Sequence, residues 1–211
     1  MIDPSTSTLG NYTVTYTTAG TCTNSSDVAI AITNLDDSTF NFSAASYCMS
    51  DTTQSPTTVV PGGSFVATPA GLSIDPTTGV IDPTTSNPDT YTITYATPGV
   101  CSSSTNVVVT IIPLEDASFN YSTIAYCTDD TTQTPSIAVP GGTFSATPAG
   151  LSIDLATGVV NPAASIAQTY TITYTTPGMC QNSSDVSLMI NPLPTPALIP
   201  NVPPGTAIEG V

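Results

Sequence analysis

Five cysteines form the most specific chemical pattern in the sequence. Cys22, Cys101 and Cys180 are spaced by 79 residues, and Cys48 and Cys127 repeat the same spacing. The sequence has no histidine and no Cys-x-x-Cys pair, which argues against a zinc site. We expect the disulfides Cys48–Cys101 and Cys127–Cys180, with free thiols as the alternative and with Cys22 unpaired. Each would contribute roughly 4 kcal/mol, and disulfides are typical of an oxidising, extracellular compartment.

Acidic side chains gather near the ends of the repeated units and are candidate ligands of a metal ion. Their oxygens suit Ca²⁺, which would stiffen the junctions, whereas the alternative is solvated loop charge. Glycosidase chemistry by paired carboxylates is not expected, because the pairs recur in every copy and the sequence has no Trp. We therefore expect no enzyme and no cofactor other than Ca²⁺. The residues concerned are Asp36, Asp37, Asp51, Glu115, Asp116, Asp129 and Asp130.

The charge composition excludes several classes of partner. The 211 residues include 15 acidic residues and no Lys, Arg or His, for a net charge of −15. Without cations the chain cannot neutralise phosphates, which excludes nucleic acid, and an anionic membrane surface would repel it. No apolar run reaches the roughly 18 residues of a membrane-spanning helix. The first residues lack a signal-peptide pattern, so we expect an excised fragment or a mature segment.

The sequence consists of about two and two-thirds copies of one unit of 79 residues. Tyr12, Tyr91 and Tyr170 follow the same step as the cysteines. Thr, Val, Ile and Tyr suit strands, while 20 prolines and 14 glycines interrupt the chain too often for long helices. We expect an all-β fold of tandem immunoglobulin-like sandwiches, arranged as an elongated rod. The expected parts are 1–35 (the end of a truncated repeat), 36–114 and 115–193 (complete repeats), and 194–211 (a Pro-rich linker or another module).

Within 36–114, strand-like runs recur at the spacing of a small sandwich, about seven in all. The expected strands are 40–43, 57–60, 64–67, 72–75, 80–82, 91–95 and 106–112.

One phrase is repeated almost without change and dominates the comparison of the two complete copies. It reads ATPAGLSIDPTTGV at 67–80 and ATPAGLSIDLATGV at 146–159. Short apolar runs on either side of a turn predict a β-hairpin or β-arch. Asp75 and Asp154 open the turn, where an aspartate usually accepts hydrogen bonds from backbone N–H groups two residues on. The phrase is therefore expected to serve the fold and not chemistry.

Tyrosines alternate with small residues in the Thr-Tyr-Thr-Ile-Thr-Tyr run that follows this phrase. Side chains two apart on a strand share one face. We expect these rings to lie in the core or beside neighbouring strands, and not to form a ligand-stacking surface. The residues are Tyr91, Tyr95, Tyr170 and Tyr174.

The order of these motifs resembles a known repeat type. The run GLSIDPTTGVI followed by TYTITY is similar to the Ig-like repeats of bacterial surface proteins. The wider order of SFNY at 118–121, YC at 126–127, GGTFSATPAGLSI at 141–153, TYTITY and Cys180 resembles tandem repeats of Bacteroidota cell-surface proteins. Many of those are exported by the type IX system, and they include SprB-type gliding adhesins. The resemblance covers about residues 1–193 and implies an extracellular, surface-anchored array.

The same resemblance extends to a short modification motif. Asp-Ser/Thr-Thr triplets resemble the O-glycosylation motif of secreted Bacteroidota proteins. The acceptor residues would be Ser38, Thr52 and Thr131.

Taken together, the sequence favours structural repeats that form the stalk of a bacterial adhesin or surface filament, with a role in attachment or gliding motility. Its partners would be neighbouring repeats of the same chain, with surface glycans or other cells reached through a distal region. One alternative is a module that binds glycan or protein itself. Another is a subunit that polymerises by strand exchange, with 194–211 completing the sheet of another chain.

Overall fold

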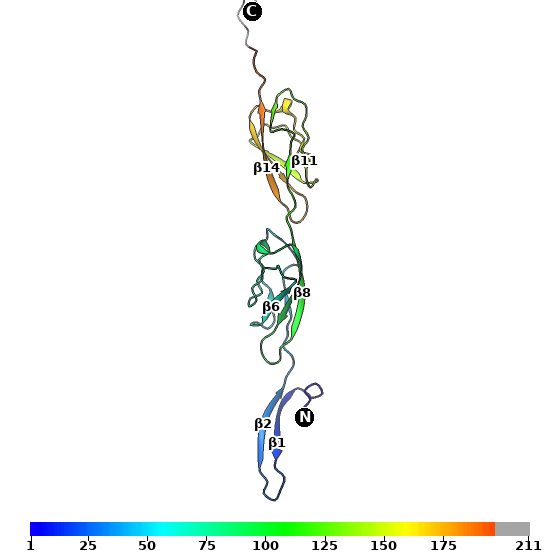
Figure 1. Cartoon of the computed structure of the whole chain (residues 1–211), viewed down its shortest axis with the longest axis vertical. Helices are drawn as coiled ribbons and strands as arrows, with labels where there is room; N and C mark the ends of the chain where they lie inside the picture. The colour runs from blue at the N-terminus through cyan, green and yellow to red at the C-terminus, as the bar shows by residue number, and fades with distance from the viewer. Residues whose placement is uncertain (197–211) are drawn as a thin grey trace, which may run out of the picture. The chain divides into compact units, whose positions relative to one another are not determined.

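The computed structural model describes residues 1–196 and shows an all-β protein without an α-helix in that range (Figure 1). It has two compact units, Met1–Leu114 and the unit that begins at Glu115. The Pro-rich segment expected at 194–211 lies outside the described residues, apart from 194–196.

From β3 onward, the first unit has the same order of short and long strands as the second, and the first unit also contains β1 and β2. In the first unit they are β1 (Gly10–Thr17), β2 (Ser25–Ile32), β3 (Phe40–Asn41), β4 (Ser46–Cys48), β5 (Thr57–Thr58), β6 (Ser64–Thr68), the 3₁₀-helix η1 (Pro83–Thr85), β7 (Asp89–Ala96) and β8 (Ser104–Ile112). In the second unit they are β9 (Phe119–Asn120), β10 (Ala125–Cys127), β11 (Ser136–Ile137), β12 (Thr143–Thr147), η2 (Pro162–Ala164), β13 (Thr169–Thr175) and β14 (Ser183–Asn191).

The main sheet of each sandwich has four strands, in the order β4-β8-β7-β6 or β10-β14-β13-β12. Its centre is the long antiparallel pair β7–β8, in which Tyr91 lies opposite Val109, and its equivalent β13–β14. One edge strand, β4 or β10, runs parallel to the long last strand. The small sheet β3–β5, or β11–β9, is the other layer, and β1 and β2 form a separate two-stranded sheet.

The core of each sandwich is built from alternating residues of the central strands and from aromatic residues of the short ones. Tyr91, Ile93 and Tyr95 on β7 are between 0% and 1% exposed, and so are their equivalents on β13. Aromatic rings meet at the centre, where the ring centroids of Phe65 and Tyr95 are 4.5 Å apart. Edge-to-face and tilted contacts of this kind add to the stability from area burial alone. The expectation that these tyrosines are core residues is confirmed.

Tyr95, at the end of the core row on β7, also connects the main sheet to the loop before β6 through hydrogen bonds. The Tyr95 hydroxyl donates to the backbone carbonyl of Val60 at 2.5 Å and accepts from the backbone N–H of Gly63 at 3.0 Å. Residue 63 must be glycine, because a Cβ there would lie 2.0 Å from the Ala96 carbonyl oxygen. Tyr174 makes the same two bonds in the second unit. A buried phenol is therefore hydrogen-bonded, as it has to be in an apolar core.

Two details of the expected strands are wrong. The 72–75 and 80–82 runs are not strands: a single antiparallel bridge, Ile74–Ile81, closes the turn, and Ile81 also bridges to Gln54. The chain then enters η1 because Pro83 cannot donate a ladder hydrogen bond. Conversely, the short parallel strand β4 was not expected, since its three residues show no alternating pattern of useful length.

We predict that Tyr95→Phe destabilises its sandwich by about 1–3 kcal/mol, because it leaves a carbonyl and an N–H without their partner in the interior. Chemical denaturation of the chain, monitored by tyrosine fluorescence, measures the effect. Tyr16→Phe is the matched control, since Tyr16 is the equivalent residue on β1 but is 69% exposed. Equal behaviour of the two variants would show that the buried hydroxyl does not stabilise the fold.

Candidate functional site

The repeated phrase forms a turn held by its aspartate. The Asp75 carboxylate accepts hydrogen bonds from the backbone N–H groups of Thr77 and Thr78, both at 2.8 Å. Gly79 follows with φ +72°, a left-handed conformation that other residues rarely adopt. Asp154 repeats this arrangement with Ala156 and Thr157. The expectation of a structural turn is confirmed.

These hydrogen bonds favour the ionised form of the turn aspartates. The backbone N–H of Thr78 first and that of Thr77 second lower the pKa of Asp75 below the usual value of an aspartate, although the side chain is exposed. The backbone N–H groups of Thr157 and Ala156 lower the pKa of Asp154 in the same way. A carboxylate that already accepts two backbone donors has a structural role, and its lowered pKa makes it a poor general acid or base at neutral pH.

The expected disulfides Cys48–Cys101 and Cys127–Cys180 are wrong. Cys101 and Cys127 carry free thiols, as does Cys22, for which this was expected. Cys48 and Cys180 are disulfide-bonded.

The cause is the length of the last strand of each unit. Cys48 ends β4 and lies opposite Ile112, the last residue of β8, whereas Cys101 lies in the loop before the first residue of that strand. Nine residues of strand extend over roughly 30 Å, whereas a disulfide needs Cα atoms within about 7 Å. In the second unit, Cys127 and Cys180 flank β14 in the same way.

The same separation divides the acidic groups that were expected to bind Ca²⁺. Asp36 donates its N–H to the Cys101 carbonyl at the start of β8, while the Asp51 carboxylate accepts from the N–H of Cys48 at its end. Glu115 and Asp130 occupy the equivalent opposite ends of β14. Within residues 1–196 no three acidic or cysteine side chains come together as a metal site. The predicted grouping is therefore wrong.

The remaining acidic residues of this group have other surroundings. Hydrogen bonds from the Thr39 side chain and then from its backbone N–H lower the pKa of Asp37, and the backbone N–H of Ser118 followed by its side chain lowers the pKa of Asp116. The Glu115 carboxylate lies against Gly178, where a Cβ would be 2.4 Å from its Oε1. Asp129 is exposed.

Two of the three expected glycosylation acceptors lie on the surface. Thr52 and Thr131 are exposed, so the prediction stands for them. Ser38 is 6% exposed and its hydroxyl is 2.7 Å from that of Thr105. Ser38 is therefore unsuitable as an acceptor in the folded chain.

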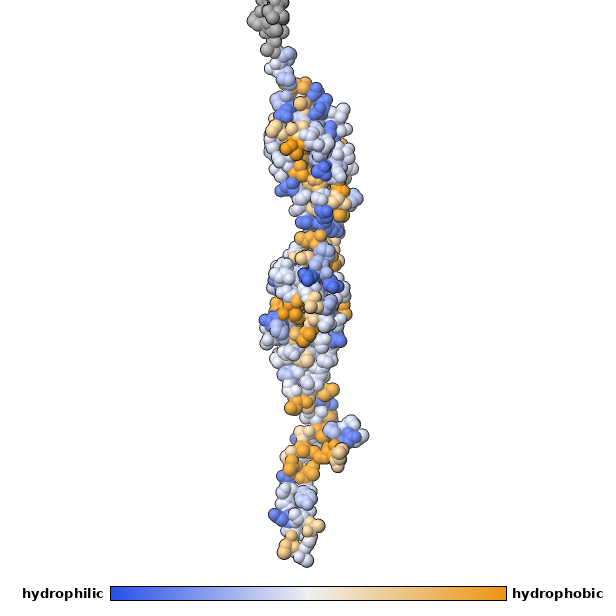
Figure 2. Space-filling model, viewed as in Figure 1, coloured by the Kyte–Doolittle hydropathy of each residue, from blue (hydrophilic) through white to orange (hydrophobic). Residues whose placement is uncertain are grey.

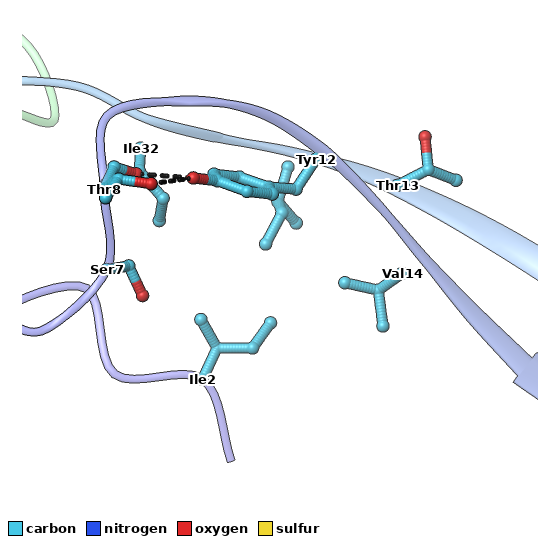
Figure 3. Close-up of a pocket in the computed structure, with 8 residues that line it drawn as sticks. Ile2, Ser7, Thr8, Tyr12, Thr13, Val14 and Ile32 are labelled. Carbon is cyan, nitrogen blue, oxygen red and sulfur yellow. Dashed lines mark hydrogen bonds between the residues drawn. The ribbon is translucent and has the colours of Figure 1, made fainter.

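A hollow that the sequence did not single out as a site lies on the β1–β2 hairpin. It measures about 400 Å³, and Figure 3 shows Ile2 opposite Val14, with Tyr12 and Ile32 beside them. The Tyr12 hydroxyl donates to the carbonyl of Thr8 at 2.8 Å. Its lining residues are Ile2, Ser7, Thr8, Tyr12, Thr13, Val14, Ile30 and Ile32. The sequence contains one signal that could have located this hollow: Tyr12 lies 79 residues before Tyr91, a tyrosine that was expected in a core.

The comparisons with known proteins do not assign a family. No family model and no curated protein matches the chain. No helix among the described residues is long and apolar enough to cross a membrane.

Structures of cadherin repeats share some similarity with the chain. Mouse cadherin-23 EC22-24 is 14% identical, with a TM-score of 0.31, over 91% of this chain and 77% of that one. Drosophila N-cadherin EC1-4 is 12% identical, with a TM-score of 0.35, over 81% of this chain and 52% of that one. Protocadherin gamma B2 domains 3–6 are 15% identical, with a TM-score of 0.32, over 88% of this chain and 59% of that one. The chain thus spans between half and about three quarters of these structures, and similarity at this level carries no functional conclusion.

We predict that thiol titration in denaturant without reductant finds three thiols per chain, and five after reduction. Pairing within each unit would instead leave one thiol. Cys22→Ser is the control and should lower the first value to two without changing the difference between the two titrations.

We predict that Asp75→Asn combined with Asp154→Asn reduces the acid sensitivity of the chain. Because folding lowers both pKa values, the stabilisation is complete above the unfolded pKa and is lost as pH falls through the lowered folded pKa. The unfolding midpoint of the unmodified chain should therefore fall more steeply in acid than that of the variant. Asp129→Asn changes the net charge without removing a turn and should leave the slope unchanged; the same slope for all three proteins would contradict the prediction.

Proposed function

We propose that the chain is a structural spacer: tandem sandwiches that provide length in the stalk of a bacterial extracellular adhesin or surface filament. The observation that carries this proposal is the position of the two ends of each sandwich. The chain enters beside one end of the longest strand and leaves from the other, so every repeat adds roughly the length of that strand.

Specific contacts fix the entry point. In the first unit, Asp36 donates its N–H to the Cys101 carbonyl, and its own carbonyl accepts from the Ser103 hydroxyl. In the second unit, Glu115 donates to the Cys180 carbonyl, and its carbonyl accepts from the Asn182 amide at 3.0 Å. Entry therefore lies at the start of β8 or β14.

The exit lies at the opposite end of the same strand. β8 ends at Ile112, two residues before the unit ends at Leu114, and β14 ends at Asn191. Pulling on the two ends loads the hydrogen bonds of the long strand with its two neighbours along the strand direction. Many such bonds must then break together, which suits a load-bearing element.

The repetition of these details supports a structural role. Both sandwiches keep the same register, the same tyrosine bonds and the same aspartate turn, and every one of these features stabilises the fold. Neither sandwich contains a cationic side chain, because the sequence has none. The resemblance to Bacteroidota surface repeats supports a cell-surface setting and attachment or gliding motility as the process served.

We predict that pulling on the ends of the chain gives two unfolding events of similar force. Each should release at most about 280 Å of extended chain for 79 residues, less the roughly 30 Å that the folded repeat spans. Single-molecule force spectroscopy measures both values, in the presence of a reductant that reduces the disulfide-bonded Cys48 and Cys180 so that the chain can extend fully. Ile172→Ala should lower the force of one unfolding event only, because Ile172 lies in the core of the second sandwich, where it is 0% exposed.

A binding role would show itself differently. A glycan array probed with the intact chain should show no binding to any glycan if the repeats act as a spacer. Saturable binding to one glycan class, lost on unfolding, would contradict the spacer function and favour the binding-module alternative.

A further inference from the structure

The β1–β2 hairpin presents on its surface the residues that are core elsewhere in the chain. Tyr12, Val14 and Tyr16 are 38%, 43% and 69% exposed, whereas their equivalents in the two sandwiches are between 0% and 1% exposed. Figure 2 shows the hydrophobic colour concentrated over part of this hairpin. An apolar sheet face of this kind marks an interaction site.

The hairpin already has the conformation that it would need in a complete sandwich. Its register places Tyr12 opposite Ile30, as Tyr91 lies opposite Val109 in the β7–β8 pair. Its loop is closed by Thr18 donating its N–H to the Asn24 carbonyl at 2.8 Å, as in the other two copies.

The residues before β1 are also in place. Ile2 is the equivalent of Ile81, which is fully buried in the first sandwich. Ser5 donates its N–H to the Asp3 carboxylate at 3.0 Å, as Thr84 does to that of Asp82. Residues 1–35 therefore match 80–114 in local structure, and among residues 1–196 no other strand pairs with β1 and β2 as β4 and β6 pair with β8 and β7.

The two complete sandwiches show which groups cover the equivalent strands. Phe65 of β6 packs its ring against Tyr95 and extends the sheet on one edge, while Phe40 lies 5.8 Å from the same ring. Tyr47 of β4 extends the sheet on the other edge. Gln54 exchanges two backbone hydrogen bonds with Ile81, both at 2.9 Å.

We propose that the apolar face and the two outer edges of the β1–β2 hairpin bind a polypeptide segment with the sequence pattern of residues 36–79. The segment adds an antiparallel strand beside β1 and a parallel strand beside β2, and places two phenylalanines over Tyr16. Its carbonyl and N–H groups at the positions of Val60 and Gly63 bind the Tyr16 hydroxyl. Strand addition to an open sheet combines main-chain affinity with side-chain specificity in this way.

The occupant has to be this whole segment, since a single extended strand covers one edge and leaves the face open. Four features of the cover come from different places along 36–79: β3, β4, β6 and the Gln54 bridge. The 194–211 segment, considered above for strand exchange, offers one short apolar run, Ala-Leu-Ile, and no aromatic residue. It therefore does not match the face.

The test uses the intact chain and a synthetic peptide of residues 115–158, in which Cys127→Ser prevents disulfide exchange. We expect saturable one-to-one binding by calorimetry. In NMR exchange experiments, amides along the outer edges of β1 and β2 should gain protection, while those of β7, β8, β13 and β14 do not change. No binding at peptide concentrations up to the millimolar range would overturn the proposal.

Three variants distinguish specific binding at this face from nonspecific binding of the peptide. Val14→Asp places a charge on the apolar face and should abolish binding, whereas Ala29→Asp, on the opposite face and outside the lining of the hollow, should leave it intact. Tyr16→Phe keeps the ring but loses its two hydrogen bonds, and should weaken binding roughly tenfold. Equal binding by all variants would overturn the proposal, as would self-association of the chain without peptide, which would show that a second copy occupies the face.

Discussion

The long antiparallel pair at the centre of each sandwich governs the rest of the unit. β8 and β14 each extend over nine residues. In each main sheet, the remaining strands are arranged in order on the two sides of this long strand. Because the chain enters beside the start of this strand and leaves at its end, the strand sets the distance between the entry and the exit of each sandwich. It also keeps apart the groups that lie near the two ends.

This separation explains the two functional expectations that were wrong. Cys48 and Cys101 lie in the same unit and next to strands, which made them natural disulfide partners in sequence. They flank the full length of β8, beyond the reach of a disulfide. The acidic residues expected to share a calcium ion are divided by the same strand. Spacing in sequence gives no measure of this distance until the strand between the residues is known to be straight and long.

The tyrosines show how a small sandwich can be stable without many large aliphatic residues. Tyr95 and Tyr174 fill the centre with their rings, and their hydroxyls fasten the main sheet to the loop before β6 or β12. The hairpin formed by β1 and β2 keeps the local hydrogen bonds but lacks the covering layer. The pairing and the turn of the hairpin therefore form from local interactions, whereas burial of its tyrosines requires the rest of a repeat.

The sequence by itself determined the all-β class, the 79-residue unit, the burial of Tyr91 and its equivalents, and the aspartate turn at Asp75. These features depend on short-range rules: alternation along a strand, the preference of glycine for positive φ, and an aspartate that accepts nearby N–H groups. Only the tertiary structure decided the parallel pairing of β4, the burial of Ser38, and which cysteines lie at which end. Those depend on how a strand of three residues is placed against one far along the chain, and such long-range pairing leaves no periodic pattern in the sequence.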